Sequence, residues 1–405
     1  MVKIDEALDI IYKTVKQKSR HIVPIEDSIG KIVAKEYRAS FDLPRFDNSA
    51  MDGYAVKLDD ASRAVNIVDT IYAGDTPQRE LRDGEAIKIM TGAPIPKGCE
   101  AIVPIEDIDF LTKDSIILPP TIKKDAMIRW RGEDIKSGRL FLKANRKVTG
   151  YTLALLASQG ISHIEVFREP KVVIFSTGEE LKAHYEKIEK HQLYNSNAPM
   201  FYARAKELGC DVSYISSSGD SLEELKKSVE EALDADLILT SGGVSVGDKD
   251  FTIEAFRELG MEILFSKVDI KPGKPTTFGR IGNSLIVNLP GNPLASMVNF
   301  EMFVKPIILK LSGSLEFYHQ TITTKIRDDY SFRGGKYSVI LGEWNGDSFM
   351  PIANQKSGMV SPLDRADGMV VATPNISSFS KNQIVKMIPI KVNIGSSKKI
   401  DFMQK

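Results

Sequence analysis

The chain has 405 residues, of which 42% are hydrophobic and 27% are charged, the balance of a folded globular protein rather than of a disordered chain. Its 54 basic and 54 acidic residues cancel, so no overall field draws the protein to nucleic acid or to anionic lipid. Any anion that it binds must therefore be held by a local site, and a chain of this length predicts roughly two to four domains.

The first part of the chain combines two helical segments with a β-rich stretch. A helix is predicted over residues 3–19, because Ile4, Ile11 and Val15 lie on one helical stripe. Between residues 46 and 140, short β-prone runs alternate with Gly, Pro and Asp turns, which predicts a β-rich insertion. These runs are Val65–Ile71, Ala86–Met90, Ala101–Ile105 and Ser115–Leu118. A second helix is predicted over Thr152–Gln159.

From about residue 170 the pattern alternates between apolar runs and helical periods. The runs are Val172–Phe175, Val212–Ile215, Leu237–Thr240 and Leu285–Leu289, and the helical periods are Ala198–Leu208, Leu222–Leu233, Phe251–Leu259 and Leu294–Leu309. This alternation predicts a parallel sheet with helices on both faces.

After Gly313 we expect the helices to stop. Five β-prone runs follow, at Thr321–Lys325, Ser338–Leu341, Phe349–Ile352, Gly368–Val371 and Ile384–Ile390. They predict a small β-barrel or sandwich.

The expected class is thus a multidomain α/β protein. We predict a small α/β N-terminal region (1–45 and 141–168), a β-rich inserted domain (46–140), an α/β domain (169–314) and a C-terminal β-barrel (315–405).

The two cysteines indicate the compartment. Cys99 and Cys210 lie far apart without a CxxC pair, so we expect neither a disulfide framework nor structural zinc. The N-terminus has no apolar signal region, and no apolar stretch approaches the roughly 20 residues that span a bilayer. A cytoplasmic protein without membrane contact is expected.

Ligands of open parallel sheets bind beyond the carboxyl ends of the strands, and three unusual loops follow such ends here. In the first, Ser176–Leu181, Glu179 could simply complement a helix dipole, whereas Glu180 is the better functional candidate.

The second loop, Gly242–Asp250, is glycine-rich, so its backbone N–H groups can face a phosphate. Asp248 and Asp250, with Asp220 from the preceding strand end, could hold a divalent cation such as Mg²⁺. A helix N-cap is the alternative for Asp250.

The same loop contains the G-x-S-x-G pattern of serine hydrolases, with Ser245 at its centre. That mechanism needs a downstream acid and histidine, and His319 is the sole downstream histidine. A serine hydrolase is therefore the second hypothesis, below phosphate binding.

The third loop, Leu289–Pro293, is stiffened by two prolines and opens a helix. Upstream, Lys267, Lys271 and Lys274 gather within a Pro-Gly-Pro frame, which indicates a local anion site.

Seven motifs carry a resemblance to a known family. They are Phe46–Val56, Met90–Pro94, Arg131–Asp134, Ser176–Leu181, Gly242–Asp250, Lys271–Pro275 and Pro290–Pro293. In this order they resemble the molybdopterin molybdenumtransferases across most of the chain.

The resemblance implies a homodimer of four-domain subunits, with molybdopterin bound by domain 169–314 and the active cleft completed by the other subunit's β-rich parts. The implied reaction takes adenylated molybdopterin and molybdate, cleaves the phosphoanhydride, releases AMP and leaves molybdenum on the dithiolene, with Mg²⁺ assisting. An adenylyltransferase of the same pathway is the expected partner. A non-catalytic scaffold is the third hypothesis.

Carried over by motif, the implied catalytic residues are Asp52, Thr91, Asp134, Glu180, Lys267 and Lys271. The implied substrate-binding residues are Ser176, Thr177, Gly178, Ser241, Gly242, Gly243, Ser245, Lys274, Pro290, Gly291, Asn292, Pro293 and Ser361. The implied metal ligands are Asp220, Asp248 and Asp250. Alternatively, Asp52 is a structural residue that stabilises an Asx turn before Gly53. Asp367 stands where the family usually has Asn and adds a negative charge near a possible ligand contact.

Overall fold

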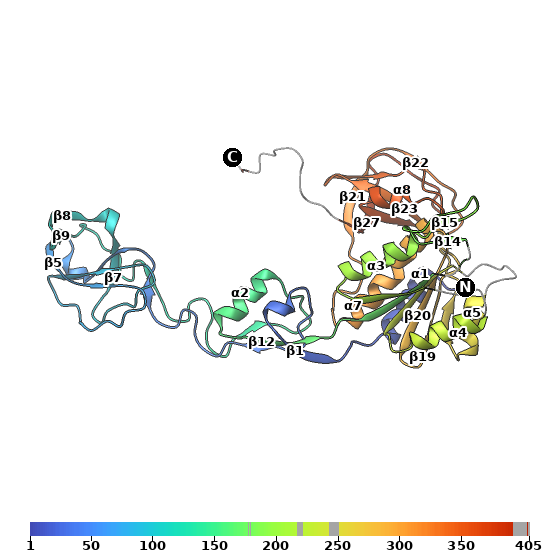
Figure 1. Cartoon of the computed structure of the whole chain (residues 1–405). Helices are drawn as coiled ribbons and strands as arrows, with labels where there is room; N and C mark the ends of the chain where they lie inside the picture. Colours follow the sequence, from blue (N-terminus) through green and yellow to red (C-terminus); the bar gives the residue numbers. More distant parts are fainter. Residues whose placement is uncertain (177, 179, 217–221, 243–250, 392–402, 404–405) are drawn as a thin grey trace. The chain divides into compact units, whose positions relative to one another are not determined.

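The computed structural model describes residues 1–176, 178, 180–216, 222–242, 251–391 and 403. The chain forms two compact units (Figure 1). The smaller unit comprises residues 23–29 and 35–164, and the larger unit comprises residues 1–22, 30–34 and 165–405. The boundary falls within β1 (Arg20–Pro24) and near the start of β12 (His163–Phe167).

The smaller unit is built on a six-stranded sheet with the order β7-β4-β6-β5-β9-β8. These strands are β4 (Gly53–Val56), β5 (Ala64–Ile71), β6 (Glu85–Ile89), β7 (Ala101–Pro104), β8 (Asp109–Thr112) and β9 (Ser115–Ile117). Apolar side chains alternate between its faces, with Tyr54 and Val56 in one core and Ala55 in another. The predicted β-rich insertion is confirmed.

Short elements complete this unit. They are β2 (Tyr37–Arg38), β3 (Asn48–Ser49), β10 (Ile128–Arg129), β11 (Leu140–Leu142), α2 (Gly150–Ser158) and single 3-10 turns at Glu26–Ser28, Leu58–Asp60 and Ile105–Asp107. Helix α2 begins two residues before its predicted start because Thr149 caps it, accepting the backbone N–H of Thr152 at 3.2 Å.

The larger unit contains a second six-stranded sheet, with the order β16-β13-β17-β20-β19-β18. Its strands are β13 (Lys171–Ser176), β16 (Asp211–Ser216), β17 (Leu237–Ser241), β18 (Glu262–Ser266), β19 (Thr277–Ile281) and β20 (Ser284–Leu289). Neighbours among β16, β13, β17 and β20 are parallel, as predicted. β19, however, is antiparallel to both of its neighbours, so the predicted parallel sheet also has an antiparallel part. The sequence pattern missed β19 because Gly279 interrupts it, at a position where a side chain would overlap the carbonyl oxygen of Glu262.

Helices cover both faces of this sheet, as predicted. Val172 and Ile174 pack with α1 (Ile4–Thr14), α3 (Asn197–Glu207), α6 (Pro293–Asn299), a π-helical turn (Phe300–Val304) and α7 (Lys305–Leu311). Val173 and Phe175 point the other way and pack with α4 (Leu222–Glu231) and α5 (Phe251–Glu258). Figure 1 shows α3 and α7 on one side of the sheet and α4 and α5 on the other. α1 ends earlier than predicted, because the backbone is extended from Val15 onward.

The last part of the larger unit is a closed five-stranded barrel, which confirms the expected C-terminal barrel. Its strands are β21 (Ile322–Ile326), β23 (Ser338–Trp344), β24 (Ser348–Pro351), β25 (Gly368–Ala372) and β27 (Ile384–Pro389), with β22 (Tyr330–Ser331) and β26 (Ser378–Phe379) paired beside it. A short helix, α8 (Ser361–Arg365), corrects the expectation that helices stop after Gly313. Proline in its first turn is compatible with a helix start. Among the described helices, none has the length and apolarity to cross a bilayer.

Candidate functional site

The carboxyl ends of β13, β17 and β20 lie together in the sheet of the larger unit. Ser176 of β13 lies opposite Ser241 of β17, and Ser241 lies opposite Leu289 of β20. Because these strands are parallel and adjacent, their carboxyl ends open on the same side. The strand ends from which the three predicted loops start therefore lie side by side.

Part of the predicted site lies outside the described residues. This holds for all three predicted metal ligands and for several substrate contacts: Asp220, Asp248, Asp250, Thr177, Gly243 and Ser245. Ser176 is described as the last residue of β13 only. Within the described ranges, no group of three or more His, Cys, Asp or Glu residues could hold a metal ion.

A buried amide ties the loop ends together. Nδ2 of Asn197, at the start of α3, donates to Oγ of Ser241 at 2.7 Å and to the carbonyl of Gly291 at 2.7 Å. Gly242 adds a backbone bond to the carbonyl of Leu289 at 3.2 Å. The side chain of Ser241 is therefore engaged in holding the β17 and β20 ends in register.

Glu180 lies shortly after β13, and its side chain is exposed. Its carboxylate approaches Gly178 so closely that a Cβ there would lie 2.8 Å from Oε1. Gly178 has a φ of +137°, a conformation that L side chains rarely adopt, so the backbone favours glycine here, whereas the exposed Glu180 side chain could move aside.

The lysine-rich loop is fixed by a second buried amide, Asn299. Oγ1 of Thr276 donates to its Oδ1 at 2.8 Å, and its Nδ2 donates to the carbonyls of Ala295 (2.7 Å) and Pro272 (3.3 Å). Gly273 has a φ of +109°, and a Cβ there would lie 1.7 Å from Nδ2 of Asn299. Only glycine fits this turn.

The same loop is attached to the barrel. The N–H of Lys271 donates to the carbonyl of Tyr337 at 2.8 Å, and its carbonyl accepts the N–H of Val339 at 2.8 Å. Lys267, at the start of the loop, has a left-handed φ of 63°. The backbone thus holds Lys271 at the junction of the α/β part and the barrel. Lys267 bonds through its backbone to Val2 and Thr276 and does not line the cleft at this junction.

A cleft of about 800 Å³ opens at this junction. Lys271 and Lys274 line it from the loop, with Pro290 and Asn292 from the end of β20. The barrel contributes Arg333, Lys336 and Lys356. We call this the cationic cleft: five basic side chains line it, and no carboxylate is found among its described lining residues. Within the described part of the chain, none of the five has an acidic partner. Unneutralised basic groups around one concavity favour an anion.

The three barrel cations were not predicted from the sequence. The glycine turn Arg333-Gly334-Gly335-Lys336 and the position of Lys356 just before Ser357-Gly358 could have marked them, but no sequence pattern connected these residues with the lysine-rich loop. Conversely, Ser361 begins α8 and does not line the cationic cleft, whereas Ser357 does.

Asp367 also lies outside the lining of this cleft. Its Oδ2 accepts the backbone N–H of Trp344 at 2.8 Å, and it lines a separate cavity of about 270 Å³ with Arg327 and Arg365. The added negative charge therefore does not face the five cations.

Asp52 and Thr91 come together in the smaller unit. The N–H and Oγ1 of Thr91 both donate to Oδ1 of Asp52, each at 2.7 Å. These hydrogen bonds favour the ionised form and lower the pKa of the Asp52 carboxyl below its usual value of 3.8. The bonds found for this carboxylate are thus long-range bonds rather than those of an Asx turn. Asp134 is exposed, and its N–H donates to the carbonyl of Leu43 at 3.1 Å.

His319 is the downstream histidine that a serine mechanism would need. Its ring is largely buried, and its Nε2 lies 2.8 Å from the carbonyl of Met302. Burial lowers the pKa of this imidazole. The imidazole is thus already paired with a backbone carbonyl of the π-helical turn, which argues against its acting as the base of a serine hydrolase.

Comparisons with known proteins agree with this geometry. Residues 2–160 match the family described as MoeA N-terminal region (domain I and II), and residues 173–310 match the probable molybdopterin binding domain. A molybdopterin molybdenumtransferase of Staphylococcus aureus strain COL is 31% identical over 399 residues, covering 96% of this chain and 95% of the relative. One of Staphylococcus epidermidis strain RP62A is 31% identical over 404 residues, covering 97% and 96%.

Solved structures give the same result. The molybdopterin biosynthesis MoeA protein from Pyrococcus horikosii aligns with a TM-score of 0.83 at 28% identity, over 97% of this chain and all of that one. A serine hydrolase is not favoured by any of these findings.

Proposed function

The chain belongs to the molybdopterin molybdenumtransferase family, and from that premise we propose that it inserts molybdenum from molybdate into adenylated molybdopterin with release of AMP. It is a transferase of molybdenum cofactor biosynthesis.

The observation that carries the proposal is the cationic cleft. Both co-substrates are anions, one through its phosphates and the other as an oxyanion, and the protein as a whole has no net charge. Five basic side chains, which have no acidic partner among the described residues, supply the local field that such ligands need. Arginine adds a planar pair of donors suited to a tetrahedral oxyanion.

In the proposed reaction, a water oxygen attacks the pterin-side phosphorus of the phosphoanhydride and forms the new P–O bond of the pterin phosphate. The bond from that phosphorus to the bridging oxygen breaks, and AMP leaves with the bridging oxygen. The dithiolene sulfurs replace oxo groups of molybdate, and each oxo group that leaves as water takes up two protons. Lys271 and Lys274 would stabilise the charge on the phosphate and molybdate oxygens. We assign the proton transfers to Glu180 and Asp134.

We further propose that Mg²⁺ assists. Asp220, Asp248 and Asp250 would hold it, and it would offset phosphate charge when bound. These residues lie outside the described ranges, so the support is the loop chemistry of the sequence alone.

We also propose a homodimer in which Asp52 and Thr91 serve the reaction, and an adenylyltransferase of the same pathway as the supplier of the adenylated pterin. The proposed location is the cytoplasm, in keeping with Cys99 and Cys210, which are both free thiols.

Size-exclusion chromatography with light scattering checks the dimer. Mixing inactive Asp52→Ala and Lys271→Ala proteins checks shared sites, because only shared sites let the mixture recover activity.

The experiment that tests the function measures AMP release from adenylated molybdopterin with Mg²⁺ and molybdate. We expect turnover that requires molybdate and is abolished by Asp250→Ala without loss of the folded oligomer. Pterin binding without AMP release would support a scaffold instead. Labelling of Ser245 by a fluorophosphonate would support a hydrolase.

A further inference from the structure

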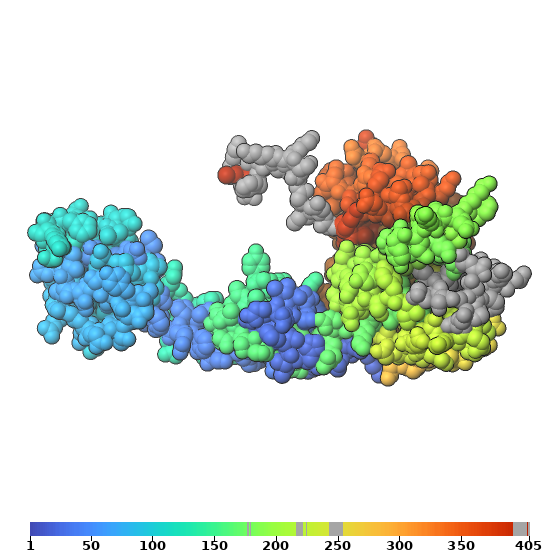
Figure 2. Space-filling view, in the orientation of Figure 1, coloured from blue at the N-terminus to red at the C-terminus, as the bar shows by residue number. Residues whose placement is uncertain are grey.

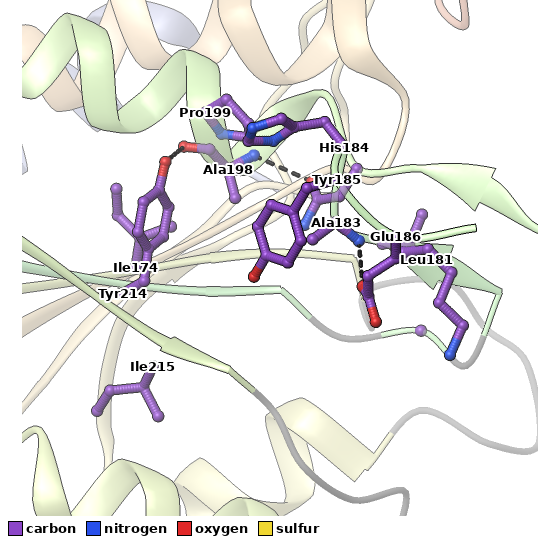
Figure 3. A pocket seen from close by; sticks show the side chains of 13 residues that line it. Ile174, Leu181, Ala183, His184, Tyr185, Glu186, Ala198, Pro199, Tyr214 and Ile215 are labelled. Carbon is purple, nitrogen blue, oxygen red and sulfur yellow. Dashed lines mark hydrogen bonds between the residues drawn. The ribbon is translucent and has the colours of Figure 1, made fainter. Parts of the chain in front are cut away.

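A second cavity lies at the same sheet edge as the cationic cleft and shares no lining residue with it. Its volume is about 430 Å³, and it is lined by the ends of β13 and β16, the start of α3 and the segment that follows Gly178 (Figure 3). We call it the aromatic pocket. Figure 2 shows the green segment around β14 (Leu181–Lys182) and β15 (Leu193–Tyr194) at the surface of the larger unit beside this region.

The walls of the aromatic pocket combine apolar and aromatic side chains with the polar residues Lys182, His184, Glu186 and Asn195. Ile174, Pro199 and Ile215 supply aliphatic surface, and the rings of Tyr185 and Tyr214 enter from different elements (Figure 3). Tyr185 is 82% exposed and Tyr214 is 47% exposed, so both present ring surface to a ligand. Tyrosine rings at the mouth of a concave site are suited to stacking on a planar heteroaromatic group.

Hydrogen bonds already fix the framework of this pocket. Oη of Tyr214 donates to the carbonyl of Ala198 at 3.1 Å, and the N–H of Ala198 donates to Oδ1 of Asn195 at 3.1 Å. The N–H of Ala183 donates to Oε2 of Glu186 at 2.6 Å. The Tyr214 ring is thus held in place before a ligand arrives.

The two cavities are close neighbours in a defined order. The aromatic pocket lies at β16 and β13. The predicted phosphate-binding loop starts after Ser241, the last residue of β17, and Pro290, just after β20, lines the cationic cleft. Asn197, next to Ala198 of the aromatic pocket, donates to Gly291, between Pro290 and Asn292 of the cationic cleft. A single side chain therefore connects the walls of the two cavities.

We propose that the aromatic pocket binds the adenine base of the nucleotide. This inference rests on the proposed function. The pterin end of the substrate carries the dithiolene and must meet molybdate at the cations. The adenosine end then extends along the carboxyl ends of β20, β17 and β13 to the aromatic pocket.

The test compares the affinities of AMP and ribose 5-phosphate, which has the same phosphate and sugar without the base, by isothermal titration calorimetry. Wild-type protein is expected to bind AMP more tightly. Tyr185→Ala should weaken AMP binding about tenfold, the loss of one base-stacking contact, and leave ribose 5-phosphate unchanged. Tyr214→Phe should retain AMP binding because it keeps the ring, whereas Tyr214→Ala should lose it.

Tyr151→Ala is the control, because Tyr151 is 91% exposed on α2 of the smaller unit and does not line the pocket. Unchanged AMP affinity in both Tyr185→Ala and Tyr214→Ala would overturn the inference, as would an equal loss for AMP and ribose 5-phosphate. Loss of pterin binding with AMP binding intact would assign the pocket to the pterin and also overturn it. In each of these cases wild-type AMP release would leave the proposed function standing, whereas its absence would remove the function itself.

Discussion

Replacing Gly273 by alanine tests how the lysine-rich loop is held. A Cβ at this position would lie 1.7 Å from Nδ2 of Asn299, and φ is +109°. Adapting to alanine must therefore displace Asn299, which is fully buried and bonded to Thr276, Ala295 and Pro272.

The expected cost has two parts. A left-handed backbone with a side chain costs about 1–2 kcal/mol, and each buried polar group left unpaired costs about 1–3 kcal/mol. Gly282→Ala is the matched control, because Gly282 also has a positive φ, +56°, but open space around its missing Cβ. We expect Gly273→Ala to destabilise the larger unit by about 2–4 kcal/mol more than Gly282→Ala does.

Urea unfolding of the two variants measures this difference, and AMP release measures its consequence. Gly273→Ala should also lower kcat/KM, since Lys271 and Lys274 flank the displaced turn. Equal unfolding midpoints for the two variants would refute the claim that Asn299 and Gly273 form one packed unit. Equal activity would refute the claim that this turn positions the lysines.

Three further predictions follow from the site. Arg333→Ala should weaken binding of inorganic phosphate or molybdate about tenfold or more, the value of a charge-assisted hydrogen bond. Lys325→Ala, which removes a barrel cation paired with Asp347, should leave this binding unchanged. Equal affinities of the two variants in calorimetry would count against the cationic cleft. Thr91→Val removes the hydroxyl that donates to Asp52 and should raise the pKa of Asp52 toward 3.8, because the wild-type bonds favour the carboxylate. The stabilisation from these bonds is present at neutral pH and fades as the pH falls through the lowered pKa. NMR titration of the carboxyl carbon checks this prediction, and an unchanged pKa would contradict it. Asn197→Ala should destabilise the larger unit by about 2–4 kcal/mol, because the partners of its amide lose their donor in a buried setting, and a thermal unfolding midpoint equal to that of the wild type would show that this amide does not hold the loops.

The sequence located the sheet edge because strand ends are local features. Alternating apolar runs marked β13, β17 and β20, and the prolines and glycines after them marked the loops. Parallel pairing then follows from the alternation of strands and helices, and the register confirmed it.

Contacts between distant parts of the chain were beyond the local pattern. Arg333 and Lys356 line the same cleft as the lysine-rich loop because the start of β23 binds that loop through Lys271. Asp52 meets Thr91 because β4 pairs with β6, which places Gly53 opposite Ile89. The spacing of these residues in the sequence predicts neither pairing. The family resemblance identified Asp52 and Thr91, whereas the barrel cations were identified from the structure alone.

The most direct test of the cationic cleft is a crystal structure of the protein soaked with tungstate, whose anomalous scattering marks the oxyanion unambiguously. The account predicts a tungsten peak within hydrogen-bond reach of the Lys271 and Arg333 side chains, and loss of that peak in Arg333→Ala crystals. A peak at full occupancy elsewhere, with the cleft empty, would contradict it.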